Sequence, residues 1–177
     1  MNKLFIAFLI LAFAGISNVQ AQEEQRAASP SAKLVQKVGL TDITIEYSRP
    51  SMKDRKIFAA DGLVPFGKSW RTGANAATKI TFSDAVKIGD GELAAGSYAI
   101  LTTPGESTWD VNFYPFEGAG AGSYAKADPA VTMRVAVVKN AVSVESFLIT
   151  IDGLRDYSAS IVFAWENTVV SLPITVN

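Results

Sequence analysis

The chain has 177 residues and a formal net charge of −1, and it contains neither cysteine nor histidine. The near-neutral charge excludes a whole-protein field that would attract nucleic acid or anionic lipid. The two missing residue types exclude disulfides, thiol nucleophiles, thiolate or imidazole metal sites and Ser-His-Asp triads. We therefore expect no metal centre, no cofactor and no nucleic-acid partner, and we assign no catalytic residue.

Residues 1–21 have the pattern of a cleaved secretory signal peptide. Lys3 makes the start positive, residues 4–16 are apolar apart from one glycine, and Ala21 ends a stretch with small residues where a signal peptidase cuts. The apolar run is shorter than the roughly 20 residues that span a bilayer, so an uncleaved anchor is the lesser alternative. We expect an exported, soluble protein of the periplasm or the extracellular space, with no membrane span after cleavage.

Residues 22–31 are polar, small and aperiodic, which is typical of a flexible tether. Residues 32–177 have the usual size of one domain. Apolar and polar residues alternate along much of this domain, which predicts strands with one buried face. The predicted strands are residues 34–38, 41–48, 79–83, 86–88, 97–103, 108–114, 131–137, 144–151, 157–165 and 168–176.

Turn signals separate several of these strands. The turns are Gly89-Asp90-Gly91, Pro104-Gly105 and Asp152-Gly153. No apolar stripe of helical period lasts for the roughly 12 residues of a globular helix, so only short helical turns are expected, near residues 57–60 and 123–126. The pattern predicts an all-β domain, an antiparallel two-sheet β-sandwich, with a β-barrel as the alternative.

One segment, Arg49 to Ala77, interrupts the alternation and is expected to be a long ordered loop. Loops of this length are usually functional or disordered, and its apolar side chains argue for order. It holds six lysine and arginine residues against two aspartates, which makes it locally basic. Guanidinium groups bind carboxylate or phosphate at two points. The candidate ligand-binding residues are Arg49, Arg55, Trp70, Arg71 and Asn75.

A structural role would explain the same arginines. Internal acids would then pair with them and hold the loop on the sheet. The acids considered for this role are Asp42, Glu46, Asp54 and Asp61. Among the tryptophans, Trp109 and Trp165 fall on the apolar side of their strands and are expected in the core, whereas Trp70 is the one expected to be exposed.

Other chemical signatures are incomplete. Ser123 and Lys126 match S-x-x-K without its partner motifs, and the glycine-rich residues 118–122 lack the lysine and the context of a phosphate-binding loop, so a flexible loop is expected. Asp152 and Asp156 indicate a turn rather than a calcium loop. A glycosidase needs two carboxylates at a set distance. The acids near strand ends are Asp110, Glu117, Asp152, Asp156 and Glu166.

Several stretches of the chain carry a family pattern. They are Leu40-Thr41-Asp42-Ile43-Thr44-Ile45, Tyr47-Ser48-Arg49-Pro50-Ser51, Arg55, Ile57-Phe58, Leu63-Val64-Pro65-Phe66-Gly67, Trp70-Arg71-Thr72-Gly73-Ala74-Asn75 and Ala95-Gly96-Ser97-Tyr98. Together they resemble the bacterial exported family called domain of unknown function number 2911. The resemblance covers most of the chain after residue 21 and implies a typical member, without implying an activity.

Three functions fit these observations. The first is a non-catalytic module that binds a small anionic or hydroxylated ligand, or an envelope protein, through the long loop. The second is a carboxylate-dependent hydrolase of envelope glycans, and the third is a purely structural envelope domain. Arginines gathered beside Trp70 favour binding, whereas two facing acids favour hydrolysis.

Overall fold

The computed structural model describes residues 27–118, 120–124 and 126–177. The predicted signal peptide and residues 22–26 of the predicted tether lie outside these residues. Within the described part, no helix is long and apolar enough to cross a membrane.

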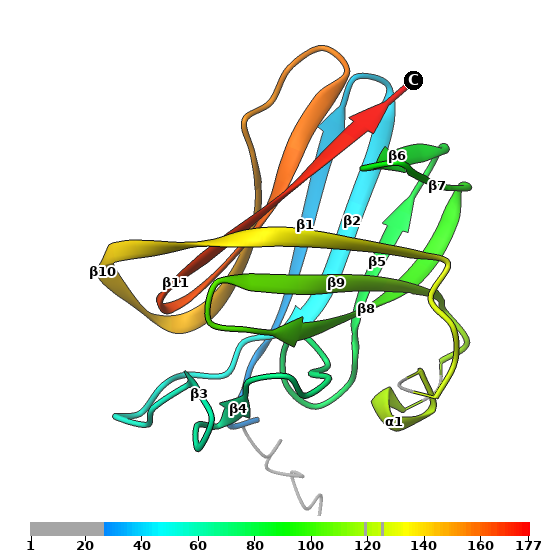
Figure 1. Ribbon diagram of the computed structural model, residues 1–177. Helices are drawn as coiled ribbons and strands as arrows, with labels where there is room; N and C mark the ends of the chain where they lie inside the picture. Colours follow the sequence, from blue (N-terminus) through cyan, green and yellow to red (C-terminus); the bar gives the residue numbers. More distant parts are fainter. Residues whose placement is uncertain (1–26, 119, 125) are drawn as a thin grey trace, which may run out of the picture.

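The described chain is almost entirely β structure, as the alternation predicts (Figure 1). In β2, for example, every second residue is buried, which places one face of the strand in the core. The elements are β1 (Ser31–Val38), β2 (Thr41–Ser48), β3 (Phe58–Ala59), β4 (Val64–Pro65), β5 (Thr78–Phe82), β6 (Val86–Ile88), β7 (Gly91–Leu93), β8 (Gly96–Pro104), β9 (Thr108–Pro115), α1 (Ala121–Tyr124), β10 (Val131–Asp152) and β11 (Ser158–Val176).

One large antiparallel sheet contains most of the strands, in the order β1-β2-β5-β8-β9-β10-β11-β6-β7. The short strands β3 and β4 pair in parallel as a second, small sheet. Because β1 and β7 are the two edges of the large sheet, it is not closed, and the barrel alternative is wrong. The two-sheet sandwich is not confirmed either, since the main strands belong to one continuous sheet.

The hairpin of β10 and β11 connects the two halves of this sheet. The first part of β10 pairs with β9, from Val131 to Ala136, and its later part pairs with β11. The sequence predicts two strands for each of these long elements. In the structure, β10 and β11 each continue as one strand through register shifts that follow Lys139 and Val144. Such irregularities bend a strand without ending it.

The core lies where the first half of the sheet meets the second. The ring of Tyr47 in β2 packs edge-on against Phe147 in β10, with 5.9 Å between centroids. The backbone N–H of Ile149 donates to the Tyr47 hydroxyl at 3.0 Å. Trp109 and Trp165 are 2% and 1% exposed, which confirms their predicted place in the core.

Two local expectations change with the structure. Residues 58–59 form β3 rather than a helical turn, because Phe58 pairs in parallel with Val64. The second expected turn, near residues 123–126, corresponds to α1 and begins two residues earlier. At the end of the predicted tether, Ser31 already belongs to β1 and the carbonyl of Pro30 accepts the Arg49 N–H at 2.9 Å.

Candidate functional site

The long loop from Arg49 to Ala77 is ordered and packs across one end of the large sheet (Figure 1). Near its start, Ser51 forms a β-bridge with Ser146 of β10. Further along, Trp70 forms a bridge with Thr102 of β8, with backbone hydrogen bonds of 2.7 and 2.9 Å in the two directions. These two attachments confirm the predicted long ordered loop.

Trp70 is half-buried, so the expectation of an exposed tryptophan is wrong. Its indole stacks on Trp165, with centroids 5.8 Å apart and planes 20° apart, and its Nε1 donates to the Gly73 carbonyl at 3.0 Å. The bridge to Thr102 holds Trp70 against the sheet. Because Thr102 is distant in sequence, this pairing leaves no periodic pattern in the loop from which it could be predicted. The other rings in contact are Phe58, Trp109 and Phe147.

A cavity of about 290 Å³ brings four of the five predicted residues together, namely Arg55, Trp70, Arg71 and Asn75. We call it the arginine cavity. Its volume is at the lower end of the range for small-molecule sites, roughly 300 Å³ and above. No acidic side chain is found among the described residues that line it. Its apolar lining includes Leu63, Val64 and Trp165, of which Leu63 is the exposed one.

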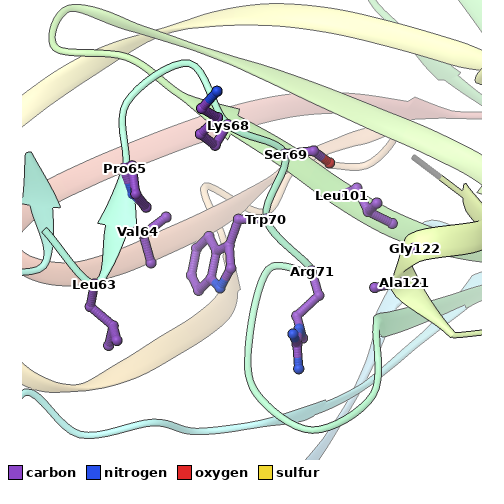
Figure 2. Close-up of a pocket in the computed structure, with 10 residues that line it drawn as sticks. All are labelled: Leu63, Val64, Pro65, Lys68, Ser69, Trp70, Arg71, Leu101, Ala121 and Gly122. Carbon is purple, nitrogen blue, oxygen red and sulfur yellow. The ribbon is translucent and has the colours of Figure 1, made fainter. Parts of the chain in front are cut away.

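A second cavity of about 370 Å³ adjoins the first (Figure 2). The two share Leu63, Val64, Trp70 and Arg71 in their linings. We call the second one the Lys68 cavity, because Lys68 adds a cation that the arginine cavity lacks. Leu101 and α1 close its other side, so Ala121 and Gly122 are helical here rather than part of a flexible loop. The described lining again contains no acid.

Arg55 and Arg71 are exposed, and both donate to backbone carbonyls. Arg55 Nε donates to Met52 O at 2.9 Å and its Nη2 to Ser51 O at 2.7 Å. Arg71 Nη1 donates to Asn75 O at 3.0 Å. Within the described ranges, neither arginine forms an ion pair with an acid. Local backbone contacts therefore orient both guanidinium groups and leave their charges unneutralised.

The acids expected to hold these arginines lie elsewhere. Asp42 pairs with Lys37, Asp61 with Lys56 and Glu46 with Lys79, whereas Asp54 forms no ion pair in the part of the chain that the structure describes. The ion-pair explanation of the loop arginines is therefore wrong. Alternation along β1 and β2 places Lys37 and Asp42 at paired positions, which explains why a lysine rather than an arginine is the partner there.

Arg49 does not line the arginine cavity. Its Nε donates to the Phe147 carbonyl at 2.9 Å, and its own N–H donates to Pro30. The half-buried side chain thus ties the start of the loop to β10. Of the five predicted site residues, Arg49 is the one that the described lining does not include.

The turn that carries Arg71 and Asn75 has an unusual backbone. Thr72 and Asn75 have φ values of 56° and 60°, in the left-handed region that non-glycine residues rarely adopt. Gly73 has φ of 158°, and a Cβ there would lie 3.0 Å from the Ser48 carbonyl. Asn75 Nδ2 donates to Ser29 O and Ser48 Oγ, each at 3.2 Å. Strain held by this many contacts is found more often at functional sites than elsewhere.

The acids named for a hydrolase are absent from the described linings of both cavities. Asp110 forms a two-point ion pair with Arg134, at 2.6 and 3.0 Å. The hydrogen bond from Arg134 lowers the pKa of Asp110, whereas a general acid needs a raised one. In residues 27–118, 120–124 and 126–177, no group of three or more His, Cys, Asp or Glu could hold a metal ion.

Sequence reasoning missed the residues that complete the two cavities. The sequence places Lys68 in the basic loop without pointing to a cavity, and Leu63 and Val64 indicate an ordered loop and the family pattern but no site. The one available signal is the apolar Leu63-Val64-Pro65 run inside a basic loop, since ligand cavities combine apolar walls with a few polar groups.

The family model described as Protein of unknown function (DUF2911) matches residues 29–174. The chain belongs to this family. No curated protein and no solved structure matches it. The residues that define both cavities of this DUF2911 protein lie inside the matched range, and the resemblance to this family, drawn from the stretches between Leu40 and Tyr98, is confirmed.

Proposed function

We propose that this DUF2911 protein is a binding module for a small anionic ligand, which enters the arginine cavity. One observation carries the proposal: Arg55 and Arg71 line the same cavity, and neither has an acidic partner among the described residues. An anion that enters meets two cations without first displacing a carboxylate.

The guanidinium groups have donors left for a ligand. Each guanidinium carries five N–H donors, and the backbone contacts of Arg55 and Arg71 use only some of them. The remaining donors match the oxygens of a carboxylate or phosphate. Beside them, Trp70 and the exposed Leu63 offer an apolar wall for the carbon part of the ligand. Hydrolysis of glycans has no comparable support.

We also propose that the protein acts outside the cytoplasm after removal of residues 1–21. The support is the charge and apolar pattern of these residues and the small residues before Gln22. Cell fractionation and intact mass test it. A protein recovered from the cytoplasm with residues 4–16 still attached contradicts export.

The binding proposal is tested by titrating purified protein with citrate, phosphate, acetate and uncharged sorbitol at low ionic strength. We expect the anions to raise Tm and sorbitol to leave it unchanged. Arg71→Ala is expected to weaken anion binding about tenfold, since a hydrogen bond to a charged group contributes roughly 1.5 kcal/mol or more.

The matched control is Arg155→Ala. Arg155 is also exposed and also donates to a backbone carbonyl, that of Leu154 at 2.8 Å. It belongs to the turn between β10 and β11, which Figure 1 shows at the end of the sheet opposite the long loop. We expect it to bind like the wild type. Equal losses in both variants would mean a general charge effect, and no binding by the wild type would refute the proposal.

A further inference from the structure

We infer that the ligand carries two separate anionic groups, one in the arginine cavity and one in the Lys68 cavity, with its carbon skeleton passing Trp70. This inference rests on the proposed function and specifies the class of ligand. It concerns the region where the two cavities meet.

The two cavities are adjacent parts of one site. Four residues line both, including Trp70 and Arg71, so the cavities are neighbours, and a ligand long enough to pass Trp70 would reach from one into the other. Figure 2 shows the side chains of Lys68 and Arg71 extending in opposite directions from the segment that carries Trp70. One compact anion cannot satisfy cations that diverge in this way, whereas two anionic groups on one skeleton can.

Each cavity adds a cation of its own to the shared Arg71. The arginine cavity has Arg55, and the Lys68 cavity has the exposed Lys68. In the described part of the chain, Lys68 has no ion pair, unlike Lys56 of the same loop, which is 2.8 Å from Asp61. The charge on both sides of Trp70 is therefore positive and unneutralised.

The wall between the cations is apolar. Leu63 and Val64 line both cavities beside Trp70, and Leu63 is 46% exposed, so its apolar surface is accessible to a ligand. A carbon skeleton over Leu63 and Trp70 would remove apolar surface from water. The site thus has the order cation, apolar surface, cation, which matches a molecule with an anion at each end.

The experiment compares pairs of probes that differ in one anionic group. Succinate, glutarate, adipate, pimelate and suberate are titrated calorimetrically against monocarboxylates of the same carbon number, with terephthalate and benzoate as a rigid pair. Both members of a pair are measured at the same ionic strength, because screening weakens each contact. We expect at least one dicarboxylate to bind about tenfold more tightly than its partner.

Lys68→Ala separates the two ends of the site. We expect this variant to lose most of the preference for the dicarboxylate and to keep the affinity for the monocarboxylate, which Arg55 and Arg71 hold. Lys68→Arg restores the preference. The control is Lys87→Ala, since Lys87 is an exposed lysine of β6, at the end of the sheet opposite the long loop.

Two results overturn the inference in distinguishable ways. If mono- and dicarboxylates bind equally and Lys68→Ala changes neither, the ligand has one anionic group and the proposed function stands. If no probe of either class binds the wild type, both the inference and the proposed function fail. A preference that Lys87→Ala also removes likewise counts against a site at Lys68.

Discussion

The arginine cavity and a second cation-lined region of the protein differ in what their cations already contact. The second region is a groove of about 550 Å³ beside β1 and β2, lined by Lys33, Glu46, Lys79 and Phe116, which we call the Phe116 groove. There, Lys79 lies 3.4 Å from Glu46 and its Nζ is 5.2 Å from the centre of the Phe116 ring. In the arginine cavity, no described acid faces Arg55 or Arg71.

The comparison separates cavity size from readiness to bind. The Phe116 groove is the larger of the two, yet an anion entering it meets the carboxylate of Glu46 and a lysine that already has two partners. The arginine cavity is smaller, and its guanidinium groups contact only neutral carbonyls. The absence of a carboxylate from the described lining, rather than volume, therefore distinguishes the candidate site.

The largest expected effect comes from the aromatic residue of each region. Trp70→Ala should lower the free energy of unfolding by about 3 kcal/mol, because it empties part of a ring cluster, and should abolish anion binding. Phe116→Ala, in the exposed groove, should cost less than about 1 kcal/mol and leave binding intact. Chemical denaturation and calorimetry measure both quantities. Similar losses of binding in the two variants would erase the contrast.

Arg49 and Arg71 sharpen the difference between scaffold and site. Arg49→Ala should lower the free energy of unfolding by about 1.5 kcal/mol, since it leaves the carbonyl of the buried Phe147 without its charged donor. Anion affinity should stay the same. Arg71→Ala should show the reverse, with nearly unchanged stability and weaker binding. A variant in which both properties fall together would place that arginine in both roles.

The positions of the strands could be predicted from the sequence better than their arrangement in the sheet. Alternation located β2 and β9 closely, because each has one face in the core. β8 is buried on both faces from Tyr98 to Thr102, and the turn signal at its end helped to locate it. Alternation could not reveal that β10 continues through the shift after Lys139, since partners on two different strands keep that chain extended. Whether strands form one sheet or two depends on such pairings, which lie far apart in sequence.

The candidate site could likewise be predicted from the sequence only in part. Local charge and composition were enough to predict that Arg55, Arg71 and Asn75 lie together, because all three belong to one loop, and they line one cavity. The positions of Arg49 and Trp70 depend on contacts with Phe147 and Thr102, in distant strands. No property of the loop sequence alone could separate the arginine that ties the loop down from the two that line the cavity.

A paired arginine provides a further contrast with the unpaired ones. Arg134 lowers the pKa of Asp110, so this carboxyl contributes stability above its unfolded pKa of about 3.9 and loses it as pH falls through the lower folded value. Because the pair is exposed, Asp110→Asn should lower Tm at neutral pH by no more than about 3 °C. Melting curves of both proteins should converge in strong acid. A constant difference at every pH would mean that the pair is not its source.

The smallest expected effect is on phosphate binding in the Phe116 groove, which the variant Glu46→Gln should make more like the arginine cavity. Glu46→Gln removes the carboxylate beside Lys79 while keeping the size of the side chain and an acceptor oxygen. Lys79 then faces the groove without a charged partner, and weak phosphate binding there should strengthen about twofold at low salt.

The shift of the Phe116 ring signals with phosphate, followed by NMR, measures this site separately from the arginine cavity. Lys33 lines the groove in both proteins, so the part of phosphate binding that depends on Lys33 is common to wild type and variant. If phosphate moves the Phe116 signals equally in wild type and variant, neutralisation by Glu46 is not what distinguishes the two regions, and shape becomes the better explanation.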